Sequence, residues 1–168
     1  MNNTLYTKLS TTVSTCRHGK CIVATALIRA GSLIFTLDGV DVKEPSKYTL
    51  QIAAKRHLDP LQSRWRFANH HCAPNAGIDL RQRAMVALRD IDPGAEVTFN
   101  YLTTEWNMSA PFRCDCGARH CPGVVAGYRY LSLRQRQAIE AIASDHVRRL
   151  GAAYARIEAV LPSPESVG

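Results

Sequence analysis

The chain reads Asn-His-His-Cys-Ala-Pro-Asn over residues 69–75 and Gly-Ala-Glu-Val-Thr-Phe-Asn-Tyr over residues 94–101, and these two stretches decide its fold. The first is a turn-rich loop whose amide and backbone groups suit a grip on a polar ligand. The second is a turn followed by an alternating strand that ends in Tyr101, where a hydroxyl can face a site. Taken singly, each has an ordinary structural explanation: a hydrogen-bonded core histidine with a buried thiol, and a hairpin strand with a half-buried tyrosine.

A third stretch, Phe-Arg-Cys-Asp-Cys-Gly-Ala-Arg-His-Cys-Pro-Gly over residues 112–123, supplies three thiols from one loop. Tetrahedral zinc takes four ligands, with sulfur at roughly 2.3 Å. Cys114 and Cys116 are too close in sequence for an easy disulfide between them, and we favour metal ligation over a disulfide framework. Cys72 is our choice for the fourth ligand, His120 is the local alternative, and reduced cysteines without metal are a third interpretation. The predicted metal ligands are Cys72, Cys114, Cys116 and Cys121.

Around these stretches the chain has the pattern of short strands joined by dense turns, which indicates a mainly β domain. Ala30-Gly31 and the turn at residues 91–94 separate apolar runs. The expected strands lie at residues 21–28, 32–37, 83–88 and 96–101, and residues 103–123 are expected to form a loop.

The C-terminal part differs, because its apolar residues recur in alternating steps of four and three. We expect one amphipathic helix over residues 131–162, with Ser132 as its N-cap and Gln135 completing a capping box. The apolar stripe can pack on its own domain or form a homodimer contact that resembles a coiled-coil seam. The stripe consists of Ala143, Val147, Leu150, Tyr154, Ile157 and Leu161.

The composition predicts one compact globular domain. Of 168 residues, 46% are hydrophobic and 21% are charged, which is ordinary for such a protein. The longest apolar run, residues 21–28, is too short to span a bilayer, and the first residues lack the core of a secretory signal. We therefore expect a chain made in the cytoplasm, without a membrane partner. The net charge of +7 fits either polyanionic surroundings or a solvated basic surface without a dedicated partner.

The three stretches, in this order, resemble the signature of the SET-domain protein-lysine methyltransferases. Residues 69–75 are similar to the family's N-H-S-C-x-P-N, residues 94–101 to G-E-E-L-T-F-D-Y, and the cysteines of residues 112–123 to the post-SET zinc motif. Upstream, His18-Gly-Lys-Cys and the later Arg29-Ala-Gly match the family's entry segment. The resemblance spans roughly residues 15–123. It departs from the family at Cys21, where a second glycine is usual, and at His71 and Ala95, which replace a serine and an acidic residue.

The resemblance implies a SET-domain β-clip fold of short sheets, in which the second and third stretches cross as a pseudoknot around the active site. It places a SET domain at residues 10–110 and a post-SET zinc-binding segment at 111–124, and the helix expected from the apolar pattern follows at 131–162. The fourth zinc ligand in the family comes from the Asn-His-x-Cys motif, which agrees with Cys72. Zinc is then structural, because four thiolates leave no open position.

The resemblance also implies the site residues. Tyr101 is the catalytic tyrosine, and Tyr48, Phe99 and Tyr101 form the substrate channel. S-adenosylmethionine is the methyl donor, with Asn69 and His70 at its adenine end and backbone of residues 18–20 at its methionine end. The implied cofactor-binding residues are His18, Gly19, Lys20, Tyr48, Arg66, Asn69, His70 and Phe112.

The implied reaction moves a methyl group from the sulfonium to a neutral lysine amine of a histone or other basic protein. No dedicated carboxylate base is expected, and water carries the proton away. Phenylalanine at position 99 leaves room for di- or trimethylation. The enzyme would be cytoplasmic as made, and nuclear or chromatin-associated in a host if exported.

Two other functions stay open at this point. A catalytically silent SET-like zinc module would bind partners through the basic surface and the C-terminal helix, and would lack affinity for the methyl donor. A structural zinc protein of nucleic-acid-binding type would show a steep salt dependence of DNA binding.

Overall fold

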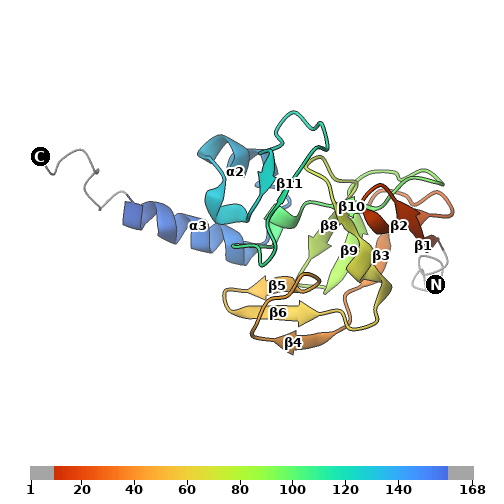
Figure 1. Ribbon diagram of the computed structural model, residues 1–168, viewed down its shortest axis with the longest axis horizontal. Helices are drawn as coiled ribbons and strands as arrows, with labels where there is room; N and C mark the ends of the chain where they lie inside the picture. Colours follow the sequence, from red (N-terminus) through yellow and green to blue (C-terminus); the bar gives the residue numbers. More distant parts are fainter. Residues whose placement is uncertain (1–9, 159–168) are drawn as a thin grey trace, which may run out of the picture.

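The computed structural model describes residues 10–158, which form several small sheets with helices at one end (Figure 1). The hairpin β1–β2 lies at the opposite end from α2 and α3, and the sheets lie between them. Within this part of the chain, no helix is long and apolar enough to cross a membrane.

Short antiparallel pairings dominate the described residues, as the turn-dense sequence predicts. The hairpin pairs β1 with β2, and two three-stranded sheets have the orders β3-β9-β8 and β4-β6-β5. The strands are β1 (Thr11–Cys16), β2 (Gly19–Ala24), β3 (Leu33–Thr36), β4 (Val40–Val42), β5 (Leu50–Ala53), β6 (Arg56–Asp59), β7 (Asn69–His70), β8 (Ala76–Asp79), β9 (Ala84–Ala87), β10 (Thr98–Phe99), β11 (Phe112–Arg113) and β12 (Val124–Val125). Three short 3-10 helices join them: η1 (Arg64–Phe67), η2 (Tyr101–Thr103) and η3 (Tyr128–Tyr130).

Two apolar clusters form the core. The larger one lies between the sheets and contains side chains such as Ile22, Leu58 and Met85, which have no exposed surface. The smaller one lies under the C-terminal helices, around Val125 and Val147. Tyr101 packs against both clusters, so it stands at their junction.

The C-terminal region forms two helices in place of the single helix expected over residues 131–162. These are α2 (Leu133–Ile139), which begins with the predicted capping box of Ser132 and Gln135, and α3 (Asp145–Glu158). The backbone N–H and hydroxyl of Ser144 both donate to the carbonyl of Thr103 at 2.8 Å. Because Ser144 donates to a carbonyl of η2 and not to a carbonyl of the preceding turn of helix, the helix is interrupted before α3.

The apolar stripe of this region packs on its own chain. Ala143 and Val147 are buried in the smaller cluster, and the ring of Tyr154 lies edge-on to Trp106 at 5.9 Å. These contacts fit the first of the two interpretations of the stripe and give no support to a homodimer. Leu161 lies outside the described residues.

The crossing of the chain joins the first and second stretches, and not the second and third as expected. β7 and β10 pair in parallel, with Asn69 opposite Thr98 and His70 opposite Phe99. Asn75 extends this ladder with its side chain: its amide donates to the carbonyl of Glu96 and its Oδ1 accepts from the N–H of Thr98, both at 2.8 Å. The buried side-chain amide of Asn75 thus makes the two hydrogen bonds that the backbone of another strand residue would make.

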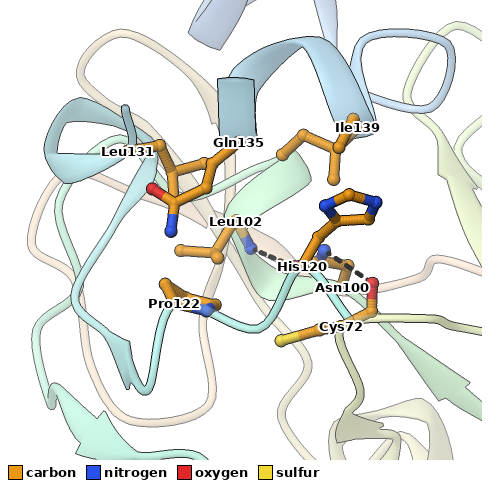
Figure 2. A pocket seen from close by; sticks show the side chains of 9 residues that line it. Cys72, Asn100, Leu102, His120, Pro122, Leu131, Gln135 and Ile139 are labelled. Atoms are coloured by element: carbon orange, nitrogen blue, oxygen red, sulfur yellow. Dashed lines mark hydrogen bonds between the residues drawn. The ribbon is translucent and has the colours of Figure 1, made fainter. Parts of the chain in front are cut away.

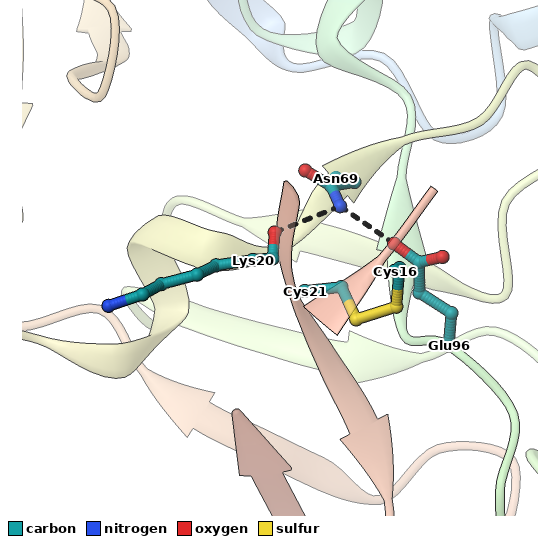
Figure 3. The surroundings of a disulfide bond; sticks show 5 residues. All are labelled: Cys16, Lys20, Cys21, Asn69 and Glu96. Atoms are coloured by element: carbon teal, nitrogen blue, oxygen red, sulfur yellow. Dashed lines mark hydrogen bonds between the residues drawn. A yellow bond between two sulfur atoms is a disulfide. The ribbon is translucent and has the colours of Figure 1, made fainter. Parts of the chain in front are cut away.

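The preference for metal ligation over disulfides is wrong for two of the six cysteines. Cys16 and Cys21 form a disulfide that closes the β1–β2 hairpin, with Cα atoms 5.9 Å apart (Figure 3). Gly19 follows the hairpin turn with φ +102°, a conformation that favours glycine. Cys21 is fully buried.

The Asn75 side chain leads to a stability prediction. We expect Asn75→Ala to lower the free energy of unfolding by about 2–4 kcal/mol, because a buried carbonyl and a buried N–H each lose their partner. Urea unfolding followed by circular dichroism measures the change. Gln82→Ala removes an exposed amide side chain and should stay within about 0.5 kcal/mol of wild type. Equal losses in the two variants would show that the ladder does not depend on Asn75.

Candidate active site

A cleft of about 810 Å³ opens between the β1–β2 hairpin, the segment before β5, the β7–β10 pair and the loop that ends in the cysteine-rich stretch. Every residue expected to bind the donor or line the channel borders it. These are His18, Gly19, Lys20, Tyr48, Arg66, Asn69, His70, Phe99, Tyr101 and Phe112. Cys21, where the resemblance expects a glycine, does not border the cleft.

Tyr101 lies where β10 ends, and its ring is 4.8 Å from the ring of Phe99. Its hydroxyl donates to the carbonyl of Ala68 at 2.9 Å. Burial, together with the negative charges of Glu105 and Glu96, raises the pKa of Tyr101 above its ordinary value. The phenol therefore stays protonated at neutral pH, with its oxygen lone pairs free to accept a hydrogen bond.

His70 connects the tyrosine to the cysteine cluster. Its Nδ1 accepts from the backbone N–H of Tyr101 at 3.1 Å, and its Nε2 lies 3.1 Å from the sulfur of Cys72. Burial and the nearby charge of His71 lower the pKa of His70 to about 4, so the ring is neutral. With Nδ1 as acceptor, the proton is assigned to Nε2, which then donates to the sulfur.

Asn69 ties the hairpin to the second stretch. Its side-chain amide donates to the carbonyl of Lys20 at 3.2 Å and to the carboxylate of Glu96 at 2.8 Å (Figure 3). These bonds hold the hairpin backbone at the edge of the cleft. The carboxylate of Glu96 also places a negative charge on the cleft wall.

Aromatic and cationic side chains form the outer wall. The guanidinium of Arg66 stacks 4.5 Å from the ring centre of Tyr48, whose side chain is 40% exposed. Phe112 is partly exposed and lies edge-on to His70 at 5.7 Å and to Tyr101 at 6.2 Å. The cleft thus combines aromatic rings with charged groups on its wall and at its rim.

Four thiols meet beside the cleft. The sulfurs of Cys72, Cys114, Cys116 and Cys121 all lie within 4.8 Å of one another, and those of Cys72 and Cys114 are 3.9 Å apart. A tetrahedron with sulfur at about 2.3 Å from zinc separates its sulfurs by about 3.8 Å, whereas a disulfide needs about 2 Å. The donor set therefore fits zinc.

His120 does not belong to this group of ligand atoms. Its ring points toward Ile139 of α2, while the sulfur of Cys72 points away from it (Figure 2). Both residues border a small pocket under α2. The geometry agrees with Cys72, and not His120, as the fourth member.

The surroundings of Cys72 and Cys114 disfavour ionisation of their thiols, and a bound cation would offset this. Burial, with the neighbouring thiols, raises the pKa of Cys72, and burial raises that of Cys114 to about 11. Burial also opposes ionisation of Cys116, but hydrogen bonds from the backbone of Ala118 and Cys72 lower its pKa to about 6. A divalent metal stabilises all four thiolates at once.

Sequence reasoning missed two residues that shape the cleft. Glu105 is a buried acid on the cleft wall, and Gln51, on β5, donates its backbone N–H to that carboxylate at 2.7 Å. Both lie outside the quoted motifs, and a single acid in an expected loop carries no periodic signal.

The comparisons with known proteins agree with this geometry. The family model described as "SET domain" matches residues 19–102. The methyltransferase flvH of Aspergillus flavus is 40% identical over 63 residues, covering 36% of this chain and 35% of the relative. The H3 lysine-36-specific histone-lysine N-methyltransferase of Yarrowia lipolytica is 30% identical over 139 residues, covering 68% and 18%. The chain thus spans about a third or less of these relatives.

Two solved structures share the fold. The methyltransferase domain of human SETMAR superposes with a TM-score of 0.53 at 19% identity, over 67% of this chain and 56% of that one. KRYPTONITE, solved in complex with mCHG DNA and SAH, superposes with a TM-score of 0.51 at 25% identity, over 65% and 27%.

The thiol geometry leads to a prediction about metal content. We expect native mass spectrometry of the purified chain to find one zinc per molecule, and Cys116→Ser to lose most of it, because three thiolates leave the tetrahedron open. The double variant Cys16→Ser, Cys21→Ser is the matched control and should keep its zinc. Full zinc occupancy in Cys116→Ser would contradict the four-cysteine site.

Proposed function

Because the chain belongs to the SET-domain family, we propose that it transfers a methyl group from S-adenosylmethionine to the side-chain amine of a protein lysine. One observation carries the proposal. A single cleft gathers the donor-binding and channel residues implied by the family from five separate segments, with a protonated phenol at its floor. The volume of about 810 Å³ lies in the range of small-molecule sites.

The residues present suit this donor. The rings of His70, Tyr101 and Phe112 form an aromatic surface, which attracts a sulfonium cation and stacks with a purine. Glu96 adds a negative charge nearby. When bound, S-adenosylmethionine supplies an electrophilic methyl group. We assign its adenine end to Asn69, His70 and Phe112, with Arg66 beside them. We assign its methionine end to the hairpin backbone at His18, Gly19 and Lys20.

Tyr101 would position the amine. Its hydroxyl proton is engaged by the carbonyl of Ala68, so its lone pairs accept an N–H from the incoming amine. This orients the nitrogen lone pair toward the methyl group, and such positioning contributes much of a bimolecular rate enhancement. Removing a proton from a free lysine costs about 4.6 kcal/mol at pH 7, and a buried channel beside a cation lowers this cost. Tyr48 and Phe99 complete the channel.

Zinc would act structurally in this scheme. Four thiolates close its coordination shell, so it offers no position to a substrate. Cys72 comes from the first stretch, and the other three ligands come from the segment that carries Phe112. The metal therefore fixes that ring beside His70. We propose residues 10–110 as the catalytic unit and 111–124 as the zinc-binding segment.

The substrate we propose is a histone or another basic protein. The support for it is that the curated relatives include several H3 lysine-36-specific enzymes. Such a substrate would place the enzyme at chromatin-like particles after synthesis in the cytoplasm. The alternative is a silent SET-like module, which would bind no donor.

The role of Tyr101 gives the first test. Tyr101→Phe should lower the rate of radiolabelled methyl transfer to core histones by about 100-fold, because the amine loses its hydrogen-bond acceptor. Binding of the donor, measured by calorimetry, should stay near the wild-type value. Tyr130→Phe, at an exposed tyrosine, is the matched control and should keep full activity. Equal labelling by wild type and Tyr101→Phe would remove Tyr101 from this role.

The extent of methylation depends on the space beside Phe99. Its ring is buried and contacts Tyr101, and phenylalanine carries no hydroxyl that could hold a water at this position. We propose di- or trimethyl-lysine as the product. Phe99→Tyr adds a hydroxyl that can hold a water there, and it should shift the product to monomethyl-lysine by mass spectrometry. An unchanged product distribution would sink this proposal.

A further inference from the structure

Glu105 is a buried acid at the cleft that the mechanism above leaves unused. It follows η2, its backbone N–H donates to the carbonyl of Tyr101 at 2.9 Å, and its side chain is 8% exposed. It borders the same cleft as Tyr101 and Tyr48. A carboxyl group in such a place needs an explanation, because burying an uncompensated anion is costly.

One oxygen of this carboxyl is fixed by the protein. Oε1 accepts from the backbone N–H of Gln51 at 2.7 Å and from the hydroxyl of Thr104 at 3.2 Å. The side chain of Gln51 holds the loop from the other side, since its Oε1 accepts from the N–H of Trp106 at 2.7 Å. Gln51 is itself buried, so the carboxyl is held by the β5 strand and cannot swing freely.

The other oxygen is free to meet a ligand. Oε2 of Glu105 makes no hydrogen bond to any residue among 10–158, and it is not among the buried polar atoms that lack a partner, so it keeps some access to solvent. Glu105 is one of the residues that line the cleft, so the cleft is the solvent space beside this side chain. No arginine, lysine or histidine in this part of the chain forms an ion pair with Glu105.

The carboxylate and the phenol act on the same space. The negative charge of Glu105 is one of the causes that raise the pKa of Tyr101. Glu105 and Tyr101 line the same cleft, so a substrate amine that donates to the oxygen of Tyr101 enters the space beside Glu105. Of the two cleft acids that act on Tyr101, Glu105 is the buried one, whereas Glu96 is half-buried and one of its oxygens accepts from Asn69.

We infer that Glu105 accepts the proton of the substrate ammonium before methyl transfer. This inference rests on the proposed function and replaces direct loss of the proton to water. One N–H bond of the ammonium breaks, and its proton joins Oε2 of Glu105, leaving a neutral amine and a carboxylic acid. The amine lone pair then forms the N–C bond as the C–S bond breaks. The methylated ammonium carries the positive charge, and Glu105 returns its proton to water.

The protonation state of Glu105 suits this step. Burial raises its pKa to about 7, although hydrogen bonds from Gln51 and Thr104 pull it downward. Near neutral pH the carboxyl is therefore present in both its protonated and its ionised form. A general base works best when its pKa lies near the operating pH. Titratable groups that line the same cleft include Tyr101, Glu96, Tyr48 and Lys47, and His146 of α3 bonds to the carbonyl of the adjacent residue, Thr104.

Single-turnover methyl transfer to core histones, measured from pH 6 to pH 10, tests the inference. In wild type the rate should rise up to about pH 7 and then level off, because the basic form of Glu105 is complete above its pKa. Glu105→Gln keeps an acceptor for Gln51 but cannot take a proton. Its rate should fall about 100-fold at pH 7 and approach wild type at pH 10, where the amine deprotonates in solution.

The controls separate a base from a structural role. Glu44→Gln, at an exposed acid, should keep the wild-type profile. Glu105→Asp keeps a carboxylate and should keep a plateau at a lower rate, so it tests the idea if the glutamine variant folds poorly. A rate in Glu105→Gln that is reduced equally at every pH, or not at all, would overturn the inference while leaving the proposed function standing.

A measurement without turnover completes the test. Carboxyl-labelled ¹³C NMR of the donor-free protein should show one glutamate resonance, absent from Glu105→Gln, that titrates near pH 7. A midpoint near the ordinary value of about 4.3 would overturn the inference. A wild-type chain that transfers no methyl group would instead overturn the proposed function, and the inference with it.

Discussion

The parallel contact between β7 and β10 is the constraint on which the rest of this structure depends. It pairs only two residues on each side, so its ladder alone is too short to be stable. Side chains supply the missing partners: Asn75 bonds to the backbone on both sides of Val97, and His70 accepts from the N–H of Tyr101. Nearly all polar groups at this crossing are therefore paired, as a buried crossing requires.

This crossing also brings the two apolar clusters and the cysteine group to one point. Tyr101 packs against both clusters, so the C-terminal helices support the cleft as well as the sheets do. His70 lies between the phenol and the sulfur of Cys72, and Cys72 joins the first stretch to the third. A change at the cysteine group would thus reach Tyr101 through the imidazole ring of His70.

Local features of this structure follow from the sequence, and long-range ones do not. The capping box at Ser132 and the grouping of the thiols of Cys114, Cys116 and Cys121 were predictable, because each depends on neighbours within a few residues. The break before α3 depends on Ser144 binding the distant carbonyl of Thr103, which no helical periodicity reveals. The stretches that cross were misassigned for the same reason. The predicted cleft residues came from the resemblance to the family's sequence motifs, whereas Glu105 lies outside all of these motifs.

A crystal structure with S-adenosylhomocysteine would test most directly whether the crossing builds one site for donor and amine. We predict the adenine beside Asn69, His70 and Phe112, the amino-acid end on the backbone of residues 18–20, and the sulfur directed at the hydroxyl of Tyr101. S-adenosylhomocysteine bound outside this cleft, or bound with its sulfur turned away from Tyr101, would contradict our interpretation.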